Sequence, residues 1–145
     1  MTNSPGDASP GGEAGAPESS APRAIVAGHG SFPQGIISAV EQITGFGSVF
    51  QPLSNSDLSG EDIETRLRAR AASLGINVFF TDLPAGSATI AVRRIMRDDP
   101  SVILVTGTNL ATLLEFVFRA DETPADAARH SVEKGRAALV AQGNC

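Results

Sequence analysis

The chain is organised around one stretch, Ala24-Ile25-Val26-Ala27-Gly28-His29-Gly30-Ser31-Phe32-Pro33-Gln34-Gly35. Its apolar start predicts a buried strand over 24–28, and a helix is predicted directly after it, over 32–44. Ser31 and Gln34 have the spacing of a capping box, and Pro33 suits a first turn because no intrahelical bond needs its N–H. A histidine thus lies at the tip of a strand–turn–helix corner. On its own, a histidine between glycines can equally be a loop or capping residue, so the rest of the chain must decide its role.

Strand and helix patterns alternate from Arg23 onward. Further strands are predicted over 48–53, 76–81 and 102–106, and further helices over 60–74, over 87–97, from Leu110, and from Thr123. This alternation predicts an α/β fold, a doubly wound, mainly parallel four-stranded sheet with helices on both faces. The hypothesis for the strand order is 2-1-3-4. Residues 136–142 suit either a continued last helix or a fifth strand.

The first 22 residues differ from the rest in composition. They consist mostly of Gly, Pro, Ala and Ser, together with Asp7, Glu13 and Glu18. Because such a segment has little apolar surface to bury, it is predicted to be a disordered tail. The chain of 145 residues then has room for one domain, over residues 23–145.

Charge and composition argue against several classes of protein. The formal net charge is −5, and the three tail carboxylates supply −3 of it, so residues 23–145 carry −2. A nearly neutral domain without Trp or Tyr is not expected to bind nucleic acid. No internal disulfide is predicted because Cys145 is the single cysteine, and no metal site because only two histidines are present, without an acid cluster. Neither a membrane span nor a secretory signal is predicted. We expect a cytoplasmic protein without a cofactor.

The candidate site lies where the strands end. In a parallel sheet of order 2-1-3-4, the first and third strands are neighbours, so His29 and Asp82 follow adjacent strand ends. The carboxylate would fix the imidazole tautomer and leave the other ring nitrogen free, as a nucleophilic histidine requires. By itself Asp82 is equally a turn-forming residue.

Gly86 precedes the next predicted helix and Ser87 begins it, so free N–H groups at this helix start can hold an anion. Gly30 lets another molecule approach His29. Ser87 can also be a plain N-cap. Asn109 is interpreted as a helix cap and His130 as a surface or packing residue. No Lys or Arg occurs in the four predicted corners at this edge of the sheet, which are residues 28–31, 54–57, 82–87 and 107–109.

Three motifs together resemble the enzyme IIA domain of the mannose-type (mannose, fructose and sorbose family) sugar phosphotransferase system. The similarity covers about residues 23–142. The motifs are Val26-Ala27-Gly28-His29-Gly30, Phe80-Thr81-Asp82-Leu83-Pro84-Ala85-Gly86-Ser87, and Gly107-Thr108-Asn109-Leu110-Ala111-Thr112-Leu113-Leu114-Glu115.

The resemblance implies a phosphocarrier. His29 would accept a phosphoryl group from the phosphocarrier protein HPr and pass it to a IIB component that phosphorylates sugar during uptake, with the membrane involved only through the IIC and IID components. It also implies a homodimer, often with an exchanged C-terminal strand, for which Ala137 to Ala141 is the candidate. No IIB domain follows within these residues, so IIB is expected to be a separate protein.

Two departures and two alternatives accompany this resemblance. The family's turn has a glycine where this chain has Ala85 and a proline where it has Ala88, so one glycine of the expected anion cradle is missing. One alternative is the related phosphocarrier subunit of a phosphoenolpyruvate-dependent dihydroxyacetone kinase. The other is a regulatory module whose phosphorylated histidine signals supply without feeding transport.

Overall fold

The computed structural model describes residues 15–17 and 21–145. Most of the predicted tail, residues 1–14 and 18–20, lies outside the described residues. Arg23 is bonded to two distant segments of the chain. Its main-chain N–H donates to the Val49 carbonyl at 2.7 Å, and its guanidinium donates to the Phe116 carbonyl at 3.2 Å and lies 4.6 Å from the centre of the Phe116 ring.

Four parallel strands form the sheet. They are β1 (Ala24–Gly28), β2 (Phe50–Ser54), β3 (Val78–Thr81) and β4 (Ile103–Val105), in the order β2-β1-β3-β4. This confirms the predicted order. Because β1 pairs with both β2 and β3, the residues that follow these three strands meet at one edge of the sheet.

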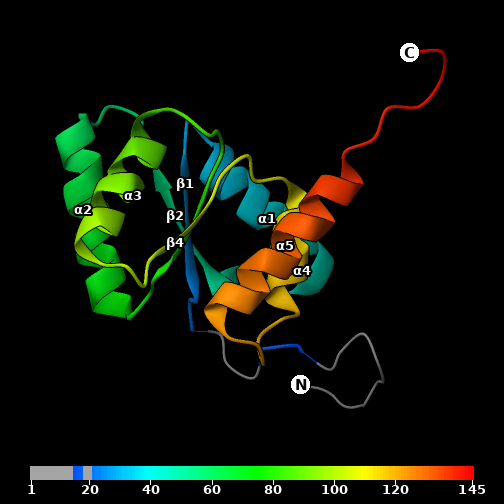
Figure 1. The fold of residues 1–145 in the computed structure, drawn as a ribbon, viewed down its shortest axis with the longest axis horizontal. Helices are drawn as coiled ribbons and strands as arrows, with labels where there is room; N and C mark the ends of the chain where they lie inside the picture. The colour runs from blue at the N-terminus through cyan, green and yellow to red at the C-terminus, as the bar shows by residue number, and fades with distance from the viewer. Residues whose placement is uncertain (1–14, 18–20) are drawn as a thin grey trace.

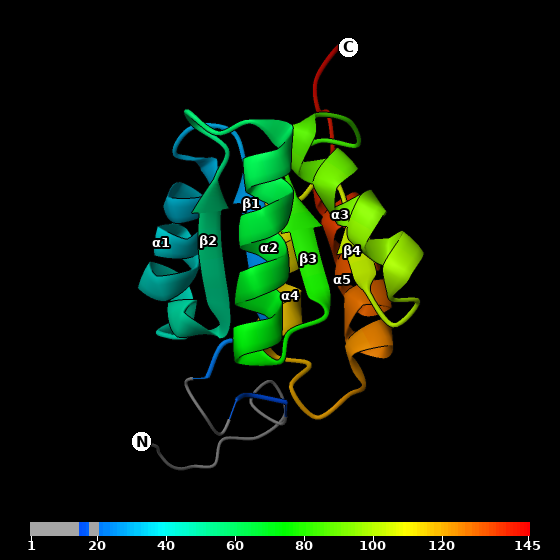
Figure 2. The ribbon, with the colours of Figure 1, turned by 90° about the vertical axis from the view of Figure 1, so that its left-hand side faces the viewer.

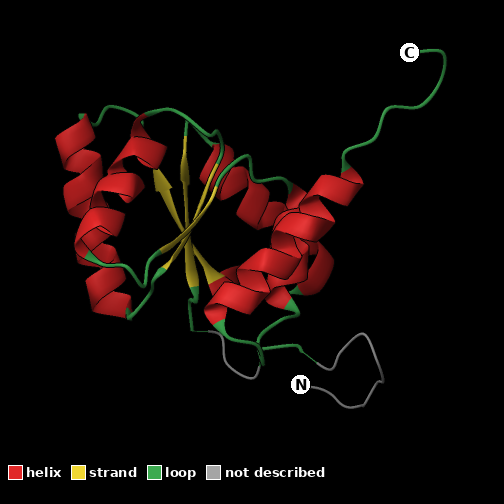
Figure 3. Ribbon diagram, in the orientation of Figure 1, coloured by secondary structure: helices red, strands yellow, loops and turns green. Residues whose placement is uncertain are grey.

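Helices cover both faces of the sheet (Figures 1 and 3). The helices α2 (Gly60–Leu74) and α3 (Ser87–Asp98) lie on one side, and α1 (Phe32–Thr44), α4 (Leu110–Val117) and α5 (Pro124–Ala138) lie on the other. Figure 2 looks onto the α2 and α3 side, with the strands behind. A short 3-10 turn over Gly47–Val49 precedes β2, so this strand begins later than the sequence pattern suggests.

The strands are mostly apolar because each face of the sheet contributes to a separate core. Side chains of successive residues point to opposite faces of a sheet. Val26 and Phe80 therefore pack with α1, α4 and α5, whereas Ile25 and Phe79 pack with α2 and α3. The sheet is held from both sides, which gives the loops at its edge a rigid base.

The start of α1 differs from the prediction. Ser31 is the N-cap, but its side chain makes no capping bond, so the predicted capping box with Gln34 is wrong. Ser31 has φ −91° and ψ 11°, away from the extended conformation of residues that cap with their side chains. The entry turn is closed by the main chain instead, with the Phe32 N–H donating to the His29 carbonyl at 3.0 Å. Ser59 and Asp62 do form a capping box, at α2.

The C-terminal segment adds no strand to this sheet within residues 21–145. Helix α5 continues to Ala138, and residues 139–145 then extend away from the domain (Figure 1). Leu139 is 83% exposed. No helix in the described residues is both long and apolar enough to cross a membrane.

We expect residues 1–20 to contribute little to stability. In the described part of this segment, the Gly15 carbonyl accepts a hydrogen bond of 2.9 Å from the Ala120 N–H. One hydrogen bond contributes about 0.5–1.5 kcal/mol. A chain beginning at Ala21 should therefore melt no more than about 5 °C below the full chain in a thermal unfolding experiment. A chain beginning at Gly15 is the control that isolates this contact. A loss of more than about 10 °C would place the segment within the fold.

Candidate functional site

The site is built on the carboxyl ends of β1 and β3. His29 follows β1 and Asp82 follows β3, and the structure brings their side chains together: His29 Nδ1 lies 2.8 Å from Asp82 Oδ2. The main-chain N–H of His29 donates to the same oxygen, also at 2.8 Å. One carboxylate oxygen therefore holds both the backbone and the ring of His29. With Nδ1 engaged, Nε2 is the ring nitrogen left to react.

The carboxylate is sheltered while the imidazole is open to solvent. The side chain of Asp82 is 11% exposed and that of His29 is 54% exposed. Burial acts to raise the pKa of Asp82, but the hydrogen bonds from the His29 N–H and ring, together with the charge of the ring, outweigh it, and the pKa is lowered. Asp82 thus stays ionised beside an imidazole ring that another molecule can reach.

Two glycines give the pair its room. A Cβ on Gly28 would lie 2.7 Å from Cγ of Asp82, so any larger residue there would displace the carboxylate. A Cβ on Gly86 would lie 3.2 Å from Cε1 of His29, and Gly86 has φ +108°, which side chains rarely adopt. The need for glycine at position 28 was missed in the sequence, although a glycine at a strand's last residue was a visible signal.

Helix α3 begins at Ser87, as predicted, and Gly86 is its N-cap, so the alternative role of Ser87 as a plain N-cap does not hold. The N–H groups of this first turn have no intrahelical acceptors. The turn before the helix is tied down by Thr89, whose hydroxyl donates to the Leu83 carbonyl at 2.6 Å and also lies 2.8 Å from the Thr81 hydroxyl. Gly30 has φ +53°, and nothing lies within 4 Å of where its Cβ would be, so its side of His29 is open.

Asn55 was missed in the sequence, where it read only as a loop residue. Its side-chain Nδ2 donates to Oγ of Ser87 at 3.0 Å, and its main-chain N–H donates to the Gly28 carbonyl at 2.9 Å. It therefore connects the loop after β2 to both the end of β1 and the start of α3.

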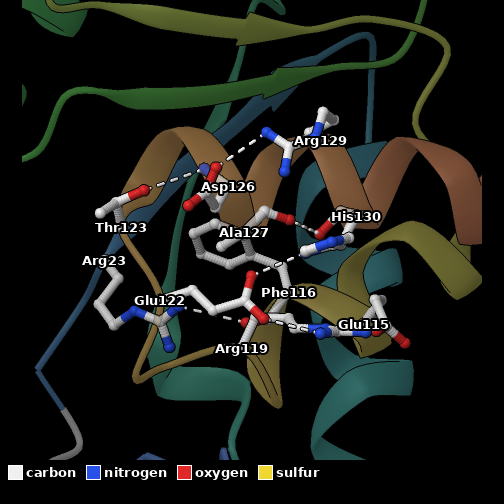
Figure 4. Close-up of polar contacts among 11 residues, drawn as sticks. Arg23, Glu115, Phe116, Arg119, Glu122, Thr123, Asp126, Ala127, Arg129 and His130 are labelled. Carbon is white, nitrogen blue, oxygen red and sulfur yellow. Dashed lines mark hydrogen bonds and ion pairs between the residues drawn. The ribbon is translucent and has the colours of Figure 1, made fainter.

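The remaining candidates lie outside this group. Asn109 caps α4, as predicted, by accepting from the Thr112 N–H at 3.0 Å. Figure 4 shows His130 on α5 pointing at Glu122: Nδ1 lies 2.8 Å from Oε1, and Arg119 bonds the other oxygen of Glu122 at 2.7 Å. His130 thus has a partner that the sequence did not suggest. No group of three metal-ligating side chains occurs among the described residues.

Residues 23–133 match the model of the protein family described as "PTS system fructose IIA component". No curated protein matches the sequence.

Solved structures show the same fold. The phosphotransferase system component EIIA from Streptococcus agalactiae has a TM-score of 0.74 and 22% identity, over 85% of this chain and 98% of that one. The mannose/sorbose-specific IIA subunit from Enterococcus faecalis has a TM-score of 0.73 and 20% identity, over 86% and 96%. A sigma-54 interaction domain protein from Enterococcus faecalis has a TM-score of 0.68 and 15% identity, over 81% and 92%.

The lowered pKa of Asp82 predicts how the pair responds to acid. A carboxyl group whose pKa falls below its usual 3.8 on folding adds stability above that pH, and this stability is lost as the pH falls through the lowered value. Wild type should therefore exceed Asp82→Asn in unfolding free energy at pH 7, by about 1 kcal/mol or less since His29 is half exposed. Urea unfolding from pH 7 to pH 2.5 measures this difference, which should shrink below about pH 4. A difference that is constant with pH would contradict the assignment.

Proposed function

Because the chain belongs to the family described as PTS system fructose IIA component, we propose that His29 carries the phosphoryl group in this protein. In this proposal His29 accepts the group from HPr and passes it to a separate IIB component for sugar uptake. The main support for this proposal is the contact of Asp82 Oδ2 with the N–H and Nδ1 of His29. This contact leaves Nε2 of an exposed imidazole free to act as nucleophile.

The transfer balances with these groups alone. The lone pair of Nε2 forms a bond to phosphorus, the bond from phosphorus to the donor's histidine nitrogen breaks, and its electron pair returns to the donor ring. The His29 ring gains positive charge, which the Asp82 carboxylate stabilises from the Nδ1 side. The second transfer repeats the step with Nε2 as the leaving nitrogen. No proton must leave Nε2, because it begins as the unprotonated nitrogen.

The phosphoryl group would lie against Gly86, Ser87 and Gly30. Gly86 lies beside the ring edge that carries Cε1 and Nε2, and the first turn of α3 begins there. Peptide N–H groups and the Ser87 hydroxyl would hold the oxygens. The departures at Ala85 and Ala88 are compatible with this cradle, because Gly86 keeps its positive φ and Ala88 is buried against the α2 and α3 core.

Two other roles use the same histidine chemistry. The chain could serve a phosphoenolpyruvate-dependent dihydroxyacetone kinase, or regulate rather than feed transport. The regulatory role is supported by the similar fold of a sigma-54 interaction domain protein. Neighbouring genes for IIC and IID components would favour transport, and kinase subunit genes would favour the kinase. A cytoplasmic location and a homodimer are further parts of the proposal.

His29→Ala should abolish labelling of the protein by phosphoenolpyruvate, enzyme I and HPr, because it removes the nucleophile. Mass spectrometry at neutral pH, and loss of the label in acid but not in base, measure the modification. His130→Ala is the matched control, since His130 also pairs with a carboxylate through Nδ1 at 2.8 Å, and it should label like wild type. Equal labelling of His29→Ala and wild type would overturn the proposal.

Asp82→Asn should slow phosphorylation by about tenfold to a hundredfold, which corresponds to about 1.4–2.7 kcal/mol of barrier. The carboxylate bonds Nδ1, so it lies nearer to the ring charge than to the phosphoryl group, and its attraction outweighs its repulsion. Ser87→Ala should slow the step less, because the N–H groups of α3 remain. Rapid-quench transfer from phosphorylated HPr gives both rates. A wild-type rate for Asp82→Asn would show that the pair does not assist transfer.

A further inference from the structure

Asn55 is hydrogen-bonded to the Ser87 hydroxyl, the group that would contact the phosphoryl oxygens in the proposed function. Its Nδ2 donates to Oγ of Ser87 at 3.0 Å, across 32 residues of sequence. The contact joins the loop after β2 to the first residue of α3. It is partly buried, so water competes with it less than it would on an open surface.

The main chain of Asn55 is fixed on two sides. Its N–H donates to the carbonyl of Gly28 at 2.9 Å, and its own carbonyl accepts from the Leu58 N–H at 3.2 Å. Gly28 directly precedes His29, and its small size gives Asp82 its room. The same backbone that places the His29–Asp82 pair therefore places the Asn55 amide.

The direction of the bond determines what the Ser87 hydroxyl can do. A hydroxyl has one hydrogen to donate and can accept two hydrogen bonds. Because the amide of Asn55 is the donor here, Ser87 keeps its own hydrogen, and its hydroxyl donates to none of residues 15–17 and 21–145. A phosphoryl oxygen is an acceptor only, so it is the partner that this hydrogen suits.

We propose that Asn55 is a positioning residue for phosphoryl transfer, which turns the Ser87 hydroxyl so that its hydrogen points to the phosphoryl oxygens on His29. This inference rests on the proposed function. Asn55 does not itself touch the reacting atoms, and it acts through Ser87. Its amide also adds a hydrogen-bond donor at the carboxyl ends of the strands. The four corners there, residues 28–31, 54–57, 82–87 and 107–109, lack Lys and Arg.

A double-mutant cycle tests the inference. Phosphoramidate is the donor, because this small molecule can phosphorylate histidine without a docked protein. We expect Asn55→Ala to slow phosphorylation of His29 by about threefold to tenfold, the effect of one hydrogen bond on a rate. In a Ser87→Ala background the same change should matter less than about twofold, because the group through which Asn55 acts is gone.

Asn55→Asp reverses the hydrogen bond. A carboxylate of nearly the same shape can only accept, so it would take the Ser87 hydrogen away from the phosphoryl group and add repulsion, and the rate should fall below that of Asn55→Ala. Asn77→Ala is the matched control. Asn77 also donates through Nδ2, to the Ser101 carbonyl at 2.9 Å. It directly precedes β3, so it lies at the amino end of that strand, away from the candidate site, and its loss should leave the rate unchanged.

The outcomes separate this inference from the proposed function. Equal effects of Asn55→Ala with and without Ser87, or wild-type rates for both Asn55 variants, would overturn the role of Asn55 alone. Modification of wild type by phosphoramidate but not by phosphorylated HPr would overturn HPr as the proposed partner. The double-mutant cycle would still test Asn55, because its donor is phosphoramidate. No modification of His29 by either donor would overturn both. Thermal unfolding of each variant should stay near wild type, which excludes a loss of rate through unfolding.

Discussion

A single carboxylate oxygen determines the geometry of the candidate site. Oδ2 of Asp82 accepts from the main-chain N–H and pairs with Nδ1 of His29, both at 2.8 Å, so the backbone and the ring of the histidine are oriented by one atom. This arrangement needs β1 and β3 to be neighbours, and it needs Gly28, because a Cβ there would lie only 2.7 Å from the carboxylate. The parallel sheet, apolar on both faces, provides the rigid base.

A phosphoryl site built in this way relies on dipoles rather than on cations. The corners around His29, residues 28–31, 54–57, 82–87 and 107–109, contain no Lys or Arg. N–H groups at the start of α3 and neutral polar side chains would stabilise an anion less than an arginine would. For the carrier that we propose, this is an advantage, since the group must leave His29 as readily as it arrives. A tightly bound phosphoryl group would raise the barrier to the second transfer.

The sequence predicted the fold and the His29–Asp82 contact because both follow from general rules. Apolar runs separated by helical patterns imply a parallel sheet, and a parallel sheet places its functional loops at one edge. The contact between Asn55 and Ser87 was not predictable, because it depends on the path of the loop after β2. The capping box at Ser31 failed for a related reason: spacing in the sequence does not determine φ and ψ, which here are set by the turn at His29.

Two histidines in this chain pair with a carboxylate through Nδ1 at 2.8 Å, yet their surroundings differ. Glu122 shares its charge with Arg119, and His130 lies on the side of α5 with 31% of its side chain exposed (Figure 4). Asp82 has no cation partner other than His29 among the described residues, and His29 is flanked by the open side of Gly30 and by Gly86. The pair geometry alone therefore does not distinguish a structural histidine from a reactive one. In the role that we propose for His29, the undivided charge of the carboxylate and the exposure of the imidazole to solvent set this pair apart.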